Sequence, residues 1–256
     1  MRKSILFTLL FSACCAQASE NRFQGFELSL GAGGSTASFD VKQPLQVVIP
    51  DALHLVGDGT ALADSNAVGL LGISYTYAFS PRFFLGLELS ADSEGTQVTK
   101  TFRIQELMSG FDLGARTQVK LNNSFTLALQ PGVLIDPNTL LYGLAGAQRG
   151  DFDISTIVTY DQSFGPDVSP FATIPLTTRS EHKTGLTLGA GVRRALSEHF
   201  TLGAEYRFAD YGKVASPGAL TAPVLLNGEA VGTMQVNVAK VAATINTLFV
   251  KLSYKV

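Results

Sequence analysis

The stretch TLFVKLSYKV, residues 247–256, alternates apolar and polar side chains almost without exception. One face of an extended strand here carries five apolar residues: Leu248, Val250, Leu252, Tyr254 and Val256. The other face carries Lys251, Ser253 and Lys255. Because successive side chains of a strand point to opposite sides, this pattern predicts a strand whose two faces meet different environments.

The same alternation recurs along the chain in segments of about 10 residues, as in membrane-spanning β-strands. Five such segments are GFELSLG (25–31), GLLGISYTYAFS (69–80), FFLGLELSAD (83–92), KTGLTLGAGVRR (183–194) and FTLGAEYRFADYG (200–212). With 46% hydrophobic and 16% charged residues, the composition fits apolar residues that are dispersed by alternation. The sequence therefore predicts an all-β protein.

The polar face of these strands distinguishes a membrane barrel from a soluble sandwich. It carries charged residues that a dry core could not hold without partners: Glu27, Glu88, Arg193, Glu205, Arg207 and Lys251. The apolar face must then point outward into lipid, and the fold is a closed antiparallel transmembrane β-barrel. Because three of the inward residues are acids and three are bases, we expect a paired charge network in the lumen.

The connections between strands alternate in length. Short ones at 80–83, 136–138 and 197–199 are predicted periplasmic turns, and long ones near 41–65, 98–112, 155–183 and 213–242 are predicted extracellular loops. LNNSF at 121–125 could be a further turn, but bacterial single-chain barrels have even strand numbers. We therefore expect one long strand over 113–135 with a bulge near Asn122 and Asn123, and eight strands in total, with ten as the alternative. Asn227-Gly228 predicts that the fourth loop extends as a β-ribbon.

The N-terminus has the pattern of a secretory signal peptide, in which Arg2 and Lys3 precede an apolar run and AQA (16–18) supplies small residues. We expect residues 1–18 to be removed and residues 19–256 to form the barrel domain. A lipoprotein cysteine at Cys14 or Cys15 is the alternative. The formal net charge of −2 gives no electrostatic footprint for a nucleic-acid partner.

Three further stretches carry a resemblance: DPNTLLYGLAGA (136–147), GLTLGAGVRRALSEHFTLGAEYRFADYGKV (185–214) and LFVKLSYKV (248–256). They resemble the small outer-membrane β-barrel family of Gram-negative bacteria, which includes opacity-type and outer-membrane protein A-like surface proteins. The resemblance implies eight strands, periplasmic termini, variable surface loops and location in the cell outer membrane. The partners it implies are outer-membrane lipid, lipopolysaccharide and the barrel assembly machinery.

The chain departs from this family at two points. Members usually end in Phe, where this chain has Val256, so Tyr254 and Val256 would form the C-terminal assembly signal. Members usually carry Trp at the membrane interface, and this chain has none. Interface anchoring is then expected from Tyr and Phe, such as Phe83, Phe84, Tyr142, Tyr206 and Tyr254.

Candidate enzyme and metal motifs are weak. Ser180 and His182 lie at i, i+2 near the outer rim, as in a barrel hydrolase, but the sequence identifies no acid to orient the histidine. Asp151 and Asp153 in RGDFDIS could bind calcium, and the glycines of GAGGS (31–35) and GAG (189–191) fit small side chains in a narrow barrel better than a nucleotide loop. We expect no catalytic residue, cofactor or metal.

The predicted loops are rich in aliphatic residues and proline: PLQVVIPDALHLV (44–56), SPFATIPLTT (169–178) and APVLLNGEAVGTMQV (222–236). Such loops either bind a ligand or pack together as a cap. The leading hypothesis is a non-enzymatic surface protein with a role in envelope structure, adhesion or host interaction through loops 41–65, 155–183 and 213–242. A small porin-like channel is the alternative, and an outer-rim lipid hydrolase ranks below it.

Overall fold

The computed structural model describes residues 22–42, 45–48, 63–108, 111–162, 170–214, 219–226, 229–237 and 240–256. The predicted signal peptide, residues 1–18, lies outside these residues. No helix in the described part of the chain is long and apolar enough to cross a membrane.

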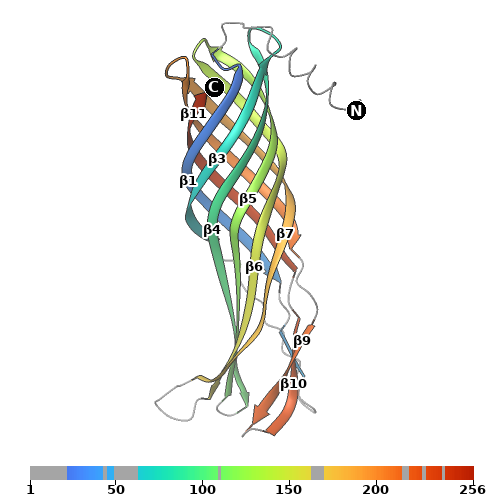
Figure 1. Ribbon diagram of the computed structural model, residues 1–256. Helices are drawn as coiled ribbons and strands as arrows, with labels where there is room; N and C mark the ends of the chain where they lie inside the picture. The colour runs from blue at the N-terminus through green and yellow to red at the C-terminus, as the bar shows by residue number, and fades with distance from the viewer. Residues whose placement is uncertain are drawn as a thin grey trace, which may run out of the picture.

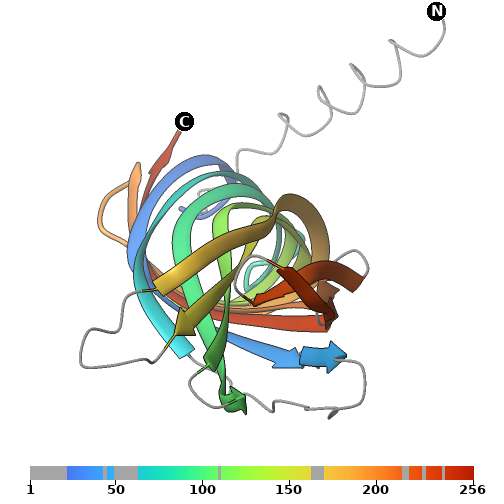
Figure 2. The same cartoon turned by 90° about the horizontal axis from the view of Figure 1, so that it is seen from below.

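Eight antiparallel strands close into a barrel, in the order β1-β11-β8-β7-β6-β5-β4-β3 (Figures 1 and 2). The prediction of eight strands is therefore confirmed. The barrel strands are β1 (Gly25–Lys42), β3 (Ala63–Ala78), β4 (Phe83–Met108), β5 (Phe111–Asp136), β6 (Thr139–Gln162), β7 (Pro170–Ala195), β8 (Phe200–Val214) and β11 (Lys240–Lys255).

Closure depends on β1, which pairs with β11 on one side and with β3 on the other. Gly31, for example, lies opposite Lys251 of β11 and Leu70 of β3. A closed ladder leaves no edge strand, so the backbone groups of the barrel wall pair with each other and not with solvent.

The three short turns are confirmed and lie at one end of the barrel. They connect β3 to β4, β5 to β6 and β7 to β8. Each is fixed by a side chain that accepts a backbone N–H: Ser80 Oγ from Phe83 (3.1 Å), Asp136 Oδ1 from Asn138 (2.8 Å) and Ser197 Oγ from Phe200 (3.1 Å). The N–H bond from Asn138 also lowers the pKa of Asp136. The C-terminus lies at this same end (Figure 1).

At the opposite end, the prediction of long loops at 98–112 and 155–183 is wrong for most of their length. β4 and β5 stay paired as far as Met108 and Phe111, and β6 and β7 stay paired as far as Asp161 and Pro170. These segments are β-hairpin extensions that continue the barrel strands well beyond the others (Figure 1). In 155–183, prolines and clustered apolar residues interrupt the alternation of the membrane part, whereas VTKTFRIQ at 98–105 still alternates and carries a signal for the extension.

The predicted bulge near Asn122 and Asn123 is confirmed, and β5 is one continuous strand. Against β6, the register shifts between Leu121 and Ser124, where two residues of β5 lie opposite one of β6. Against β4, the shift lies between Ser93 and Thr96, and the extra residue belongs to β4. An extra residue reverses which positions point inward. Val119 and Leu121 are buried on one side of the bulge, and Ser124 and Thr126 on the other, so the bulge keeps one continuous inner face.

Two predicted loops meet in a second sheet of three strands, in the order β2-β10-β9. β2 (Leu45–Val48) comes from the first long connection, and β9 (Ala219–Leu226) and β10 (Glu229–Asn237) come from the fourth. β9 and β10 pair from Leu226 and Glu229 onward, which confirms the predicted β-ribbon, although Asn227 and Gly228 lie outside the described residues.

The outer face of the barrel is apolar. Leucines there are about half exposed, as for Leu28 (49%), Leu87 (50%) and Leu129 (51%). In water, a continuous surface of this kind would be a severe aggregation liability, whereas acyl chains solvate it. The inner face is tightly packed: a Cβ at Gly33 would lie 1.9 Å from the backbone oxygen of Leu248, which explains a glycine there.

Candidate functional site

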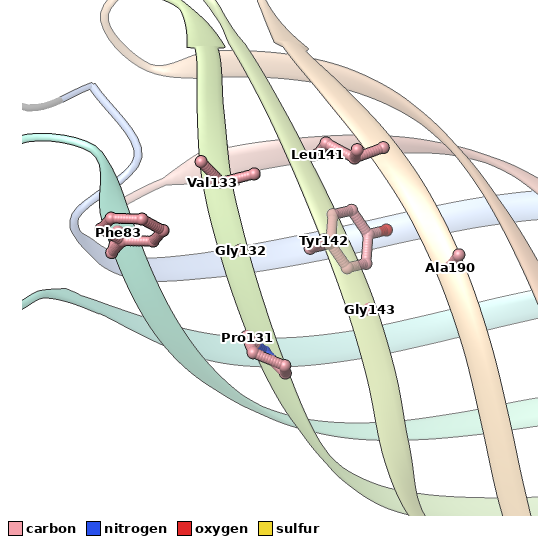
Figure 3. Close-up of a pocket in the computed structure, with 8 residues that line it drawn as sticks. All are labelled: Phe83, Pro131, Gly132, Val133, Leu141, Tyr142, Gly143 and Ala190. Atoms are coloured by element: carbon pink, nitrogen blue, oxygen red, sulfur yellow. The ribbon is translucent and has the colours of Figure 1, made fainter.

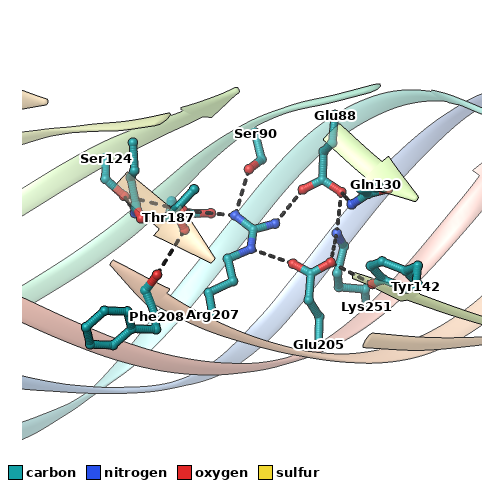
Figure 4. A network of polar contacts seen from close by, with 12 residues as sticks. Glu88, Ser90, Ser124, Gln130, Tyr142, Thr187, Glu205, Arg207, Phe208 and Lys251 are labelled. Carbon is teal, nitrogen blue, oxygen red and sulfur yellow. Dashed lines mark hydrogen bonds and ion pairs between the residues drawn. The ribbon is translucent and has the colours of Figure 1, made fainter. Parts of the chain in front are cut away.

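The lumen contains a layer of buried charged side chains, drawn in part in Figure 4. All six residues that the sequence placed on the inner face are at most 4% exposed: Glu27, Glu88, Arg193, Glu205, Arg207 and Lys251. They come from β1, β4, β7, β8 and β11, so the layer joins strands on all sides of the barrel. Charges this deeply buried are tolerated only when they are paired and hydrogen-bonded.

Arg207 lies at the centre of this layer. Its Nε donates to Glu205 Oε1 at 2.5 Å, and its Nη1 donates to Ser90 Oγ at 2.9 Å. Its Nη2 donates to Glu88 Oε1, and its Nη1 also lies 3.5 Å from Asp92 Oδ2. One guanidinium thus bridges three acids, which its fork of N–H donors allows.

Lys251, the lysine of the C-terminal strand, connects two of these acids. Its Nζ donates to Glu88 Oε2 at 2.7 Å and to Glu205 Oε2 at 3.1 Å. The hydroxyl of Tyr142 donates to the same Glu205 oxygen at 2.6 Å. Glu88 and Glu205 therefore share two cationic partners, Arg207 and Lys251.

Arg193 forms the part of the layer nearest the short turns. Its Nη1 lies 3.1 Å from Glu27 Oε2, and its Nη2 lies 3.8 Å from Glu88 Oε2 and donates to Gln130. Its guanidinium also stacks 4.6 Å from the centroid of the Tyr142 ring. The structure thus brings all six predicted lumenal residues into contact, directly or through a shared acid.

Two lumenal acids were missed by the sequence reasoning. Asp92 and Glu94 are each 2% exposed and accept weak bonds from Ser124 Oγ at 3.3 and 3.2 Å. Asp92 Oδ1 and Glu94 Oε2 have no hydrogen-bond partner. The signal that could have found them is the alternation itself, because Asp92 and Glu94 continue the inward series of Glu88 and Ser90.

These acids change the expected balance of the lumen. Among the described residues, the fully buried charged side chains are five acids and three bases, not three of each. The predicted network of three acids and three bases therefore lacks two lumenal acids. The excess lies toward the hairpin extensions, where Glu94 accepts hydrogen bonds from Ser124 and Gln148 and forms no ion pair with another described residue.

Apolar layers enclose the charged layer on both sides. Toward the short turns lies a cluster of Phe23, Phe84, Leu140 and Ala195. Toward the hairpin extensions lies a larger cluster: Ala37, Phe39, Val98, Val119, Leu121, Phe152, Ile154, Ala209, Tyr211, Ala243 and Ile245. Each of these side chains is at most 8% exposed, so little solvent reaches the interior from either end. The arrangement is that of a packed barrel.

The outer rim holds the residues of the hydrolase hypothesis, on the lipid-side face of β6 and β7. Contrary to the sequence expectation, His182 does have an acid partner, since its Nδ1 contacts Asp151 Oδ1. Ser180, however, donates its hydroxyl to Asp153 Oδ1 at 2.5 Å, and Asn122 donates to Asp153 Oδ2 at 2.5 Å. These two bonds lower the pKa of Asp153. Serine and histidine thus belong to separate pairs, an arrangement that does not activate the serine.

The carboxylates of this rim and of the lumen are the groups that could bind a metal ion. The described residues contain no group of three or more histidine, cysteine, aspartate or glutamate side chains that could hold a metal ion. The calcium reading of Asp151 and Asp153 therefore has no support, because Asp153 is already occupied by Ser180 and Asn122.

The sequence matches the family described as outer membrane protein beta-barrel domain over residues 6–241. The chain belongs to this family. It is thus an outer-membrane protein of a Gram-negative bacterium. In the orientation expected from the sequence, the short turns lie at the periplasmic end and the hairpin extensions at the cell exterior. No curated protein matches the sequence.

Several solved structures share the barrel. The attachment invasion locus protein Ail of Yersinia pestis is 17% identical, with 91% of this chain and 100% of Ail covered and a TM-score of 0.39. OprG from Pseudomonas aeruginosa is 18% identical, with 91% and 97% covered and a TM-score of 0.43. The outer membrane protease OmpT from Escherichia coli is 12% identical, with 91% and 97% covered and a TM-score of 0.45. At these values the likeness concerns the fold alone.

The interface aromatics of this outer-membrane barrel differ in part from the expectation. Phe83, Tyr206 and Tyr254 are 44–52% exposed on the outer face and can anchor the barrel in the interface. Phe84 and Tyr142 are only 1% and 3% exposed, so the prediction that they anchor the barrel is wrong. The reason is parity: each lies one position from an outward residue and points into the lumen.

The C-terminal residues complete the periplasmic end of the barrel. Tyr254 packs against Phe200 with ring centroids 5.2 Å apart, and the Val256 N–H donates to the carbonyl of Phe26 at 3.0 Å. That Tyr254 and Val256 serve as a signal for barrel assembly stays a prediction.

Proposed function

We propose that this outer-membrane barrel is a non-enzymatic, non-conducting scaffold that presents its β-hairpin extensions and three-stranded sheet for contact with a surface or host ligand. The observation that carries the proposal is the order of layers in the lumen: apolar, charged, apolar. A pore needs a continuous polar path, whereas here both ends of the charged layer are covered by packed apolar side chains. An eight-stranded barrel is also just wide enough for its own side chains to fill it.

The external part of the chain supports a contact role. Connections 41–65 and 213–242, which we propose as ligand-binding segments together with 155–183, converge in the sheet of β2, β10 and β9. In that sheet β10 is central, and β2 and β9 are its edges among the described strands. The edge strand of a sheet can offer its backbone groups to an extended partner segment, a common mode of peptide recognition.

Two tests address the two halves of the proposal. In planar bilayers, the purified barrel is expected to give no sustained current, because the apolar layers exclude ions. Reproducible open levels would instead support the porin-like alternative. A control barrel with a wide polar lumen shows that insertion and detection work.

For the contact role, residues 219–237 would be replaced by a short Asn-Gly turn. Bacteria that carry this variant are expected to adhere less to an epithelial monolayer than bacteria with the intact chain. The variant must still show the faster gel migration of a folded barrel when unheated. Unchanged adherence by a folded variant would contradict a role for this sheet.

A further inference from the structure

The lipid-facing wall of the barrel has a shallow groove near its periplasmic end. Its volume is about 440 Å³. Figure 3 shows its lining side chains on β4, β5, β6 and β7. The residues whose side chains or Cα atoms face lipid there are Phe83, Pro131, Val133, Leu141, Gly143 and Ala190.

The groove results from the sequence of β5 and β6. Along the outer face, leucines such as Leu129 and Leu141 stand out from the wall, whereas Gly143 and Ala190 provide almost no side chain. Pro131 adds a second effect, because it has no N–H to give to β6. Leu129 pairs with Ala145 and Gly132 with Tyr142, and the ladder of β5 and β6 is interrupted between these two pairs, at Pro131. The wall is thus both thin and incompletely hydrogen-bonded at this point.

The position of the groove determines what it meets. Phe83 is the first residue of β4, and Val133 lies three residues before the end of β5, so the groove begins just inside the periplasmic turns. The surrounding outer face is apolar, with Leu85 and Leu141 each 45% exposed. The groove therefore opens to acyl chains of the periplasmic leaflet, whose lipids are phospholipids.

The end of the barrel next to the groove carries exposed arginines. Arg82 precedes Phe83, and its carbonyl accepts the N–H of Leu134 at 2.9 Å. Arg194 lies on the same outward face of β7 as Ala190, roughly 13 Å along the strand at 3.3 Å per residue. Arg22 is held at the same turn by a 2.9 Å bond from its Nη1 to Asn138 Oδ1. Asp136 is the acid in this turn, so the local charge is positive although the chain is formally −2.

We propose that the groove binds an acyl chain of an anionic phospholipid, whose phosphate is held by Arg82 and Arg194. Along the membrane normal, the apolar groove and the arginines follow the order of a lipid, with the acyl chain in the membrane and the phosphate at its surface. Arginine binds phosphate through paired N–H donors, so the headgroup charge adds to the apolar contact.

Gly143 allows a test that fills the groove without disturbing the barrel. A Cβ at Gly143 would have its nearest neighbours at 4.0 Å, Pro131 Cγ and the oxygen of Gly189, so Gly143→Leu fits on the outer surface. Gly69→Leu is the matched control, because Gly69 is exposed on the outer face of β3 with nothing within 4 Å of an added Cβ. Arg82→Ala with Arg194→Ala removes the headgroup contacts.

The measurement is native mass spectrometry of the barrel, released from detergent after incubation with phosphatidylglycerol or with phosphatidylcholine. The wild type and Gly69→Leu are expected to retain one phosphatidylglycerol. Gly143→Leu is expected to bind it about tenfold more weakly, because the new side chain occupies the space of the acyl chain. The double arginine variant is expected to lose at least about tenfold, as for the loss of one hydrogen bond to a charged group. Unheated gel migration checks that each variant is folded.

Two results would overturn the proposal. Equal retention of both lipids, or retention unaffected by Gly143→Leu, would mean that only non-specific boundary lipid is present. A wild-type dimer that Gly143→Leu converts to a monomer would mean that the groove is occupied by a second copy of the chain.

Discussion

Replacement of Arg207 by alanine is the most direct probe of the lumen. The side chain is 2% exposed and contacts Glu88, Glu205 and Asp92, with Ser90 as a fourth partner. Its removal leaves these acids with Lys251 and Arg193 as the remaining cations of the layer. The variant should therefore lose more unfolding free energy than one ion pair contributes, since negative charge stays without compensation inside the barrel.

The expected magnitude follows from this burial. Removing one partner of a buried ion pair typically costs about 3–5 kcal/mol of unfolding free energy. We place Arg207→Ala in that range, because Lys251 still contacts Glu88 and Glu205 at 2.7 and 3.1 Å and limits the damage. Arg207→Lys keeps the charge but loses the fork of donors, so its cost should fall between wild type and Arg207→Ala.

The matched control is Arg149→Ala. Arg149 is an exposed arginine on the outer face of β6, and exposed charges contribute at most about 1 kcal/mol. Unfolding in urea can be followed for all three variants in lipid vesicles by circular dichroism and by the gel shift between folded and unfolded barrel. Tryptophan fluorescence is unsuited, because the chain has no Trp. Equal stability of Arg207→Ala and Arg149→Ala would refute a stabilising charge network in the lumen.

Three further predictions concern other parts of the barrel. Glu94→Gln should stabilise the barrel by about 1–3 kcal/mol, because it removes a buried carboxylate with an unpaired oxygen. The gain should be larger in alkaline than in mildly acidic buffer, since the carboxylate that it removes is charged at high pH. A destabilised variant in urea titrations would contradict this. Gly33→Ala should destabilise by about 1–3 kcal/mol because the new Cβ meets the Leu248 backbone, whereas Gly69→Ala should be neutral in the same assay. Ser180→Ala should raise the pKa of Asp153 in the folded protein toward its usual value. The stability that this carboxylate contributes is present above its unfolded pKa and is lost as pH falls through its folded pKa, so the variant should lose it at a higher pH. An unchanged titration of the carboxyl group by nuclear magnetic resonance would argue against the Ser180 bond.

The membrane part of the fold was predictable because its chemistry has a period of two. In Leu28, Leu87 and Leu252 the outward parity is visible directly, and Glu27, Glu88 and Lys251 then fall inside. The strand number followed from one further physical rule, the even count of bacterial barrels, which led to a bulge at Asn122 and Asn123 in place of a turn. The first inference depends only on local residues, and the second needs the strand count of the whole barrel in addition.

The parts that sequence reasoning missed depend on contacts between distant residues. Asp151 lies opposite His182 only through the register of β6 and β7, which the sequence alone does not state. The extension of β6 and β7 was missed for a different reason, since beyond the membrane neither face meets lipid and the alternation is no longer required. The excess of lumenal acids is a different case, because it was visible in the sequence. The inward series of β4 continues from Ser90 to Asp92 and Glu94, two and four positions further along the strand.

The charged layer also explains why one register is chosen over its neighbours. A shift of β11 by one residue against β1 and β8 would exchange its two faces, so that Lys251 and Ser253 would point into lipid and Val250 and Leu252 into the lumen. Lysine on the lipid face costs about 2–4 kcal/mol near the bilayer midplane. The same shift would leave Glu88 and Glu205 without the Nζ that now lies 2.7 and 3.1 Å away. A buried network adds little net stability compared with a well-packed apolar core. It still disfavours the slipped register in two ways, because Lys251 would enter lipid and the two acids would lose its Nζ. The alternation of the last ten residues thus specifies both the face that meets lipid and the alignment of the strand that closes the barrel.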